Sequence, residues 1–136
     1  VARPRGIIIL NKEIFITEVI KNRISIYTLN GKFKRYIGEN ILKFPRGLDI
    51  FNNNVIVADS GNNRIIELSI TGQIINIIEN FNSPNDVVTY ENQIIVSEWY
   101  NKSIKIYNLK SENYKVYKIP IGSGYLSMLS IYLNKL

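Results

Sequence analysis

Short apolar runs alternate with clusters of turn-forming residues along the middle of the chain. Between Gly47 and Ile78 the runs read GLDIF, VIVAD, RIIELSI and QIINII, and taken together they are rich in β-branched residues. Runs of this length and composition, bounded by asparagine and glycine, predict strands rather than helices. The clusters NNN and DSGNN predict tight hairpins, and Thr71-Gly72 predicts the turn from the third strand to the fourth.

The same pattern occurs three times, at a spacing of about 40 residues. Four antiparallel strands in a unit of this length are typical of a β-propeller blade. We therefore predict an all-β fold with one blade over about residues 2–43, a second over 44–82 and a third over 83–122. Three sets of residues mark equivalent positions: Pro4, Pro45 and Pro84; the acids Glu18, Asp59 and Glu98; and Arg23, Arg64 and Ser103.

A partial fourth copy follows at about residues 123–136. The segment YLNKL at 132–136 resembles YENQI at 90–94, which predicts the first strand of a fourth blade. A terminal helix is the alternative, because Met128 and Tyr132 lie four residues apart. Propellers close with four to eight blades. We therefore expect the ring to be completed by a longer parent chain, a second copy or a different subunit.

The composition excludes several kinds of chemistry. The 136 residues include no histidine and no cysteine, which removes the commonest general base, the commonest zinc ligand and all disulfide or thiolate chemistry. The net charge of +6 permits binding to nucleic acid, acidic proteins or anionic surfaces. No apolar run approaches the roughly 18 residues of a membrane helix, and no signal peptide is recognisable. These features lean towards a cytoplasmic location.

The polar cluster at residues 59–64 has a structural interpretation. Asn63 tolerates a positive φ at the corner of the hairpin. We expect Asp59 to accept hydrogen bonds from the backbone amides of this turn, and Arg64 to reach back to its carboxylate. Weaker versions of the same arrangement are expected at the equivalent positions: Glu18 with Arg23, and Glu98 with Lys102.

The middle unit resembles the NHL repeat. The pattern P-x-G-L-D, then VIVADSGNNRI, then a later T-G carries the resemblance from Pro45 to Gly72. The first unit departs from it at ITEVI and the third at WYNKS, yet three units and one strand together follow the pattern. The resemblance implies a six-bladed propeller that binds protein or RNA. It also implies a distant relation to lyases and lactonases that hold a metal in the central channel.

One face of the predicted propeller collects residues typical of binding sites. Strand alternation places the loops before each first strand on the same face as the loops between each second and third strand. Trp, Tyr and Arg dominate the energetics of protein interfaces, so we predict a protein partner here. Packing of Trp99 between blades and ordinary solvation of the arginines are the plainer alternatives. The candidate residues are Arg5, Arg46, Trp99, Tyr100 and Lys102, with Arg3 beside them.

An RNA-binding function is the first alternative. Aromatic side chains could stack on bases while Lys and Arg contact phosphates. Charged outer strands also protect sheet edges against aggregation, which explains the same residues without a ligand. A basic outer rim is expected at Lys32, Lys34, Arg35, Lys115 and Lys118.

A metal-dependent enzyme is the second alternative. Asp49 and Asp86 fall in or near innermost strands and could face the channel, where carboxylates can bind a divalent cation. Asp86 aligns with Gly47 rather than with Asp49, so the two acids form no repeated ring. We therefore predict a scaffold that performs no catalysis and uses no metal or cofactor.

Overall fold

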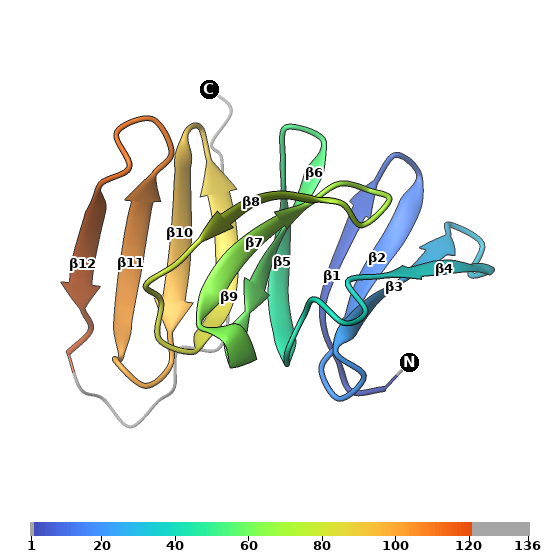
Figure 1. Ribbon diagram of the computed structural model, residues 1–136, viewed down its shortest axis with the longest axis horizontal. Coiled ribbons are helices and arrows are strands. Elements are labelled where there is room, and N and C mark those ends of the chain that lie inside the picture. The colour runs from blue at the N-terminus through green and yellow to red at the C-terminus, as the bar shows by residue number, and fades with distance from the viewer. Residues whose placement is uncertain (1, 121–136) are drawn as a thin grey trace.

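The computed structural model describes residues 2–120, in which the strands form three four-stranded antiparallel sheets (Figure 1). The predicted all-β fold of propeller type is confirmed. The segment at 123–136, predicted as a strand or a helix, lies outside the described residues. Blade 1 contains β1 (Pro4–Leu10), β2 (Glu13–Glu18), β3 (Arg23–Thr28) and β4 (Phe33–Ile37). Blade 2 contains β5 (Pro45–Phe51), β6 (Asn54–Asp59), β7 (Arg64–Leu68) and β8 (Ile74–Ile78), with the 3-10 turn η1 (Ser60–Asn62) between β6 and β7. Blade 3 contains β9 (Pro84–Tyr90), β10 (Gln93–Glu98), β11 (Ser103–Asn108) and β12 (Tyr114–Lys118).

Residues with positive φ form the tight turns of each blade. Asn52 and Asn53, with φ of 47° and 62°, close the β5–β6 hairpin. Two consecutive left-handed residues match the right-handed twist of the flanking strands, which is why asparagine is favoured here. Gly72, with φ of 92°, lies in the turn from β7 to β8, and its N–H donates to the carbonyl of Ser69 at 2.9 Å.

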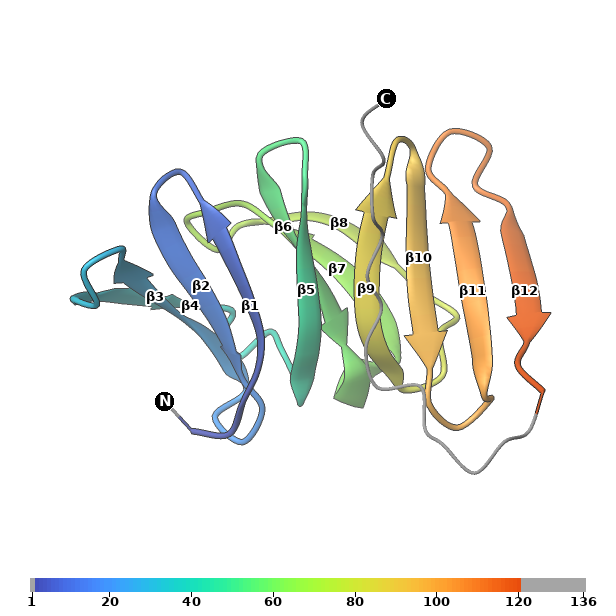
Figure 2. The same ribbon diagram turned by 180° about the vertical axis from the view of Figure 1, so that it is seen from behind.

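The innermost strands β1, β5 and β9 lie side by side in Figure 2. Each blade then runs outwards, in chain order, to β4, β8 or β12. The loops before the first strands and the loops between second and third strands gather at the lower end of the molecule in Figure 1. This arrangement places three loop pairs, one from each blade, around a common surface.

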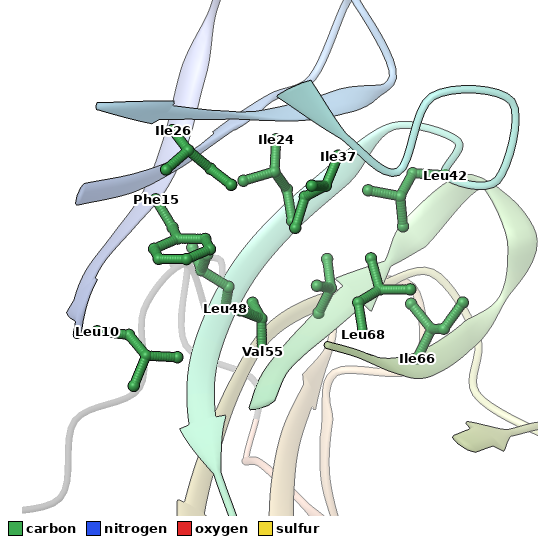
Figure 3. Close-up of a cluster of buried hydrophobic side chains, with 11 residues drawn as sticks. Leu10, Phe15, Ile24, Ile26, Ile37, Leu42, Leu48, Val55, Ile66 and Leu68 are labelled. Atoms are coloured by element: carbon green, nitrogen blue, oxygen red, sulfur yellow. The ribbon is translucent and has the colours of Figure 1, made fainter. Parts of the chain in front are cut away.

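Two apolar clusters hold neighbouring blades together. Strand β6 contributes to both, because Val55 and Val57 pack against blade 1 while Ile56 and Ala58 pack against blade 3. All four side chains are at most 1% exposed, and burial of each valine or isoleucine contributes about 1.5–3 kcal/mol. Blade 2 is therefore covered on both faces. Figure 3 shows the cluster between blades 1 and 2, formed by Leu10, Phe15, Ile24, Ile26, Ile37, Leu42, Leu48, Val55, Val57, Ile66 and Leu68.

Blade 1 buries only one face among the described residues. Phe15 is 0% exposed on the side that meets blade 2, whereas Ile7 and Ile9 of β1 are 65% and 61% exposed. The register pairs Ile7 with Ile16 and Ile9 with Ile14, so these isoleucines share the uncovered side of the sheet.

Polar contacts fix the innermost strands relative to one another. Thr17 Oγ1 of β2 bridges β1 and β5, because it accepts the N–H of Gly6 at 2.8 Å and donates to the carbonyl of Arg46 at 2.7 Å. A Cβ on Gly47 would lie 1.9 Å from Asp86 Oδ1, so β5 and β9 can approach this closely only because residue 47 has no side chain. Across residues 2–120, the structure has no helix with the length and apolar character needed to span a membrane.

Candidate functional site

The acid at the end of each second strand ties two loops together. In blade 2, Asp59 is 0% exposed and its Oδ1 accepts the backbone N–H of Lys43 at 2.7 Å. Its Oδ2 accepts Arg64 Nε at 2.7 Å and Asn62 Nδ2 at 2.9 Å. Arg64 also donates to the carbonyl of Ile41 at 2.9 Å. Asp59 therefore holds the loop before β5. The prediction that it accepts from the backbone amides of its own turn is wrong.

Blades 1 and 3 vary this arrangement. Arg23 Nε donates to Glu18 Oε2 at 2.7 Å, as in blade 2. In blade 3, Glu98 Oε2 accepts Asn101 Nδ2 at 3.0 Å, as Asp59 accepts Asn62, but Ser103 Oγ at 3.1 Å takes the place of the arginine. The predicted pairing of Glu98 with Lys102 is wrong, because neutral donors on either side of residue 102 occupy that oxygen.

Lys102 occupies a backbone corner that recurs in every blade. The φ angles of Asn22, Asn63 and Lys102 are 54°, 53° and 46°. Both asparagines use this corner to reach the next blade: Asn22 Oδ1 accepts the N–H of Phe44 at 2.8 Å, and Asn63 Oδ1 accepts the N–H of Ser83 at 2.9 Å. The corner directs the side chain of residue 102 to the same end of the molecule, but with a cation in place of an amide.

A cavity of about 700 Å³ opens at this end, and residues from all three blades line it. The strand alternation predicted this convergence, because it places both kinds of loop on one face. Blade 1 contributes Arg3 and Val19; blade 2 contributes Phe44, Arg46, Ser60 and Gly61; blade 3 contributes Ser83, Trp99, Tyr100 and Lys102.

Arg46 connects the cavity to the blade interface. Its guanidinium carbon lies 5.0 Å from the centre of the Trp99 ring, within the range of a cation–π contact. Nη1 donates to Asn85 Oδ1 at 3.0 Å, whereas the buried Nε has no hydrogen-bond partner among the described residues. Burial lowers the pKa of Arg46 below its usual range, and the nearby charges of Arg5 and Arg3 lower it further. The site therefore holds a cation that its surroundings compensate incompletely.

Of the five residues predicted to bind a partner, four line the cavity and Arg5 does not. Trp99 is 37% exposed and Tyr100 is 76% exposed, so neither ring is enclosed between blades. Arg46 is half-buried, which excludes a freely solvated loop charge. Arg5 is exposed and acts on Arg46 through its charge, but it does not line the cavity.

Sequence reasoning missed Phe44 and Ser83 as lining residues. Both stand directly before the recurring proline, as Arg3 does, and the φ angles of the three are 47°, 44° and 51°. The residue before each proline therefore occupies the same left-handed position in every blade. The spacing of the prolines was the signal that could have identified these two residues.

In the basic outer rim of blade 1, Lys34 and Arg35 are both paired with Glu13. Glu13 Oε2 accepts Arg35 Nη2 at 2.9 Å, Glu13 Oε1 accepts Arg35 Nη1 at 3.0 Å, and Lys34 forms an ion pair with the same carboxylate. These hydrogen bonds lower the pKa of Glu13 to about 2. Arg35 also donates to the carbonyl of Ile70 at 2.7 Å, which links blade 1 to blade 2.

Asp49 and Asp86 contact backbone in the innermost strands. Asp49 Oδ2 accepts the N–H of Thr89 at 2.7 Å and its hydroxyl at 3.1 Å, which ties β5 to β9. Asp86 Oδ1 accepts the N–H of Val87 at 3.0 Å. Within residues 2–120, no group of three acidic side chains is arranged to hold a metal ion.

Three stacked sheets, with innermost strands side by side and loops gathered at one end, define the chain as a β-propeller segment. Residues 42–67 match the family model described as the NHL repeat, so blade 2 is an NHL repeat. No curated protein sequence matches the chain.

Solved β-propeller structures share this fold. A chain of a nidogen/laminin complex is 21% identical with a TM-score of 0.75; the match covers 85% of this chain and 47% of that one. A catalytically inactive virginiamycin B lyase from Staphylococcus aureus, solved with quinupristin, is 24% identical with a TM-score of 0.69, over 88% of this chain and 42% of that one. The present chain therefore spans less than half the length of these structures.

Proposed function

We propose that this protein is a non-catalytic NHL-type propeller that binds a protein partner through the cavity face. One observation carries the proposal: loops from all three blades converge on a single cavity where Arg46 lies over Trp99. Trp, Tyr and Arg are the side chains that contribute most to protein interfaces, because they combine large contact area with directional hydrogen bonds. Trp99, Tyr100 and Arg46 supply all three types within one cavity.

The acids near this face are buried and hold the hairpins in place. They are therefore not placed to act on a substrate, which favours a binding function over catalysis. Glu18, Asp59 and Glu98 are each at most 2% exposed, and each accepts a hydrogen bond from the first residue of the third strand of its blade. A general acid or base needs a titratable group within reach of a substrate. The described lining of the cavity contains cations, aromatic rings and small residues, but no carboxylate.

The nidogen/laminin neighbour is consistent with a protein partner, since that structure is a complex of nidogen and laminin. A lyase is also among the neighbours, so the fold is compatible with both kinds of function. We further propose that additional blades, from a longer chain or another subunit, complete the ring beyond blade 1. The exposed Ile7 and Ile9 support this, because neighbouring blades cover the equivalent apolar faces elsewhere.

Site-specific photo-cross-linking tests the proposed function. Tyr100, 76% exposed at the cavity, is replaced by p-benzoyl-phenylalanine; the matched control replaces Tyr117, 52% exposed on the outermost strand β12. We expect protein adducts from position 100 and far fewer from position 117. With the cross-linked partner purified, Trp99→Ala should weaken its binding by about 2 kcal/mol, as at an interface hot spot. Adducts to nucleic acid at position 100, or equal adducts at both positions, would contradict the proposal.

A further inference from the structure

The cavity carries positive charge without compensating acids. Arg3, Arg46 and Lys102 line it, and the charge of Arg5 acts on Arg46 from beside it. Like charges gathered around a concave surface raise the local concentration of anions. Glu18 and Asp59 are paired with Arg23 and Arg64, and Glu98 accepts from neutral donors without lining the cavity.

Arg46 also holds an unused hydrogen-bond donor. Its Nη1 donates to Asn85 Oδ1 at 3.0 Å, but its buried Nε has no acceptor among the described residues. A buried donor without an acceptor is unfavourable, and a guanidinium forms its strongest hydrogen bonds to carboxylate or phosphate oxygens. The charge of this guanidinium is therefore incompletely compensated, and an anion placed against the part of Arg46 that lines the cavity would offset it.

The surroundings of this donor favour an anionic group attached to an apolar body. Phe44, Trp99 and Tyr100 line the same cavity as the cations. A volume of about 700 Å³ accommodates a few side chains of a bound segment. A peptide that carries acidic residues beside apolar ones has this combination of properties.

Single-stranded RNA fits the arrangement less well. Non-specific strand binding needs a basic groove that follows several phosphates, with aromatic faces open for stacking. The rim cations Lys34 and Arg35 are paired with Glu13 instead of extending the cavity. One face of the Trp99 ring is already occupied by the guanidinium of Arg46.

We propose that the cavity binds an acidic peptide segment of the partner, with an aspartate or glutamate carboxylate against the guanidinium of Arg46 where it lines the cavity, and with Lys102 beside it. This inference rests on the proposed function and adds the chemical class of the segment that is bound. The carboxylate would lie between the cations while its apolar neighbours contact Trp99, Tyr100 and Phe44.

The experiment uses two mixtures of blocked heptapeptides that differ only at their centre, Glu-x-Glu in one and Gln-x-Gln in the other. Trp99 is the only tryptophan, so its single indole N–H signal reports directly on the cavity. We expect the acidic mixture to bind about tenfold more tightly than the amide mixture, because charge-assisted hydrogen bonds to the guanidinium require the carboxylate.

Three variants localise the effect. Arg46→Gln should abolish the preference for the acidic mixture. Lys102→Asn should reduce it severalfold, and this change keeps the backbone corner, since asparagine stands at the equivalent positions 22 and 63. Lys110→Asn removes the same charge from the exposed β11–β12 turn at the opposite end of blade 3 and should leave the preference unchanged.

The outcomes separate this inference from the proposed function. Equal binding of both mixtures overturns the carboxylate inference but leaves a protein partner in place. Failure of both mixtures to shift the indole signal at about 1 mM also overturns the inference, and the cross-linking at position 100 then decides the proposed function on its own. Tight, salt-sensitive binding of a uridine decamer without peptide binding overturns both.

Discussion

The loops at 59–64 in blade 2 and 98–103 in blade 3 follow similar paths but use their side chains differently. In both, an acid accepts the N–H of the residue two places before the proline: Asp59 from Lys43 at 2.7 Å, and Glu98 from Asn82 at 2.9 Å. Both loops also reach a left-handed corner, at Asn63 and at Lys102. The asparagine before the corner also donates to the acid in both blades, from Asn62 at 2.9 Å and from Asn101 at 3.0 Å, so three shared features hold the loop in place.

The first two positions after the acid carry different side chains in the two blades. Blade 2 has Ser60 and Gly61 there, whereas blade 3 has Trp99 and Tyr100, and all four line the cavity. Blade 3 also needs no arginine for its acid, because Ser103 supplies a neutral donor. A hairpin built from the same repeat thus holds its shape in one blade and offers candidate binding residues in another.

The largest effect on this comparison is expected from Asp59→Asn. The side chain of Asp59 is fully buried and lies 2.7 Å from Arg64, which is 17% exposed. An amide would leave the charge of Arg64 without its counterion, so the free energy of unfolding should fall by about 3 kcal/mol. Urea unfolding measures the change, with Lys110→Asn as a neutral control. A loss below about 1 kcal/mol would mean that the pair is not the main support of this loop.

Exchanging the corner residues should change stability in opposite directions. Asn63→Lys removes the acceptor for the N–H of Ser83, 2.9 Å away, and should cost about 1.5 kcal/mol. Lys102→Asn places a residue that tolerates positive φ at a corner with φ of 46°, and should stabilise by about 0.5 kcal/mol. Thermal unfolding of the two single variants tests this. Destabilisation by Lys102→Asn would show that the two corners are not equivalent.

Glu98→Gln should cost less than Asp59→Asn. The amide oxygen can still accept the N–H of Asn82, and the partners Asn101 and Ser103 are uncharged. No counterion is left behind, so we expect a loss of about 1 kcal/mol in urea unfolding. A loss as large as that of Asp59→Asn would show that the charge of Glu98 matters beyond these bonds.

The smallest change in the free energy of unfolding is expected in the outer rim, where the contribution of Glu13 depends on pH. The pKa of Glu13 is lowered from 4.5 to about 2 by its hydrogen bonds to Arg35 and Lys34. A lowered pKa in the folded state stabilises the protein above pH 4.5, and the contribution disappears as the pH falls towards 2. Glu13→Gln should therefore cost about 0.5 kcal/mol at pH 7 and nothing near pH 2. An equal loss at both pH values would exclude an electrostatic origin.

The blades could be predicted from the sequence because their hairpins depend on contacts between residues close together in the chain. The hairpins depend on asparagine and glycine at positive φ, and the pair of Asp59 and Arg64 lies only five residues apart. Such contacts form between neighbours along the chain, so residue type and spacing are enough to predict them. The prolines and the repeated acid then set the spacing that indicated a propeller.

Only the tertiary structure decided which side chains meet between blades. Arg46 and Trp99 are distant in sequence, and their contact depends on how β5 packs against β9, where Gly47 allows a close approach. The same packing brings Asn63 to Ser83 and places Phe44 in the cavity. Periodicity predicts the face on which a loop lies, but the distances within that face follow from the apolar clusters that fix one blade against the next.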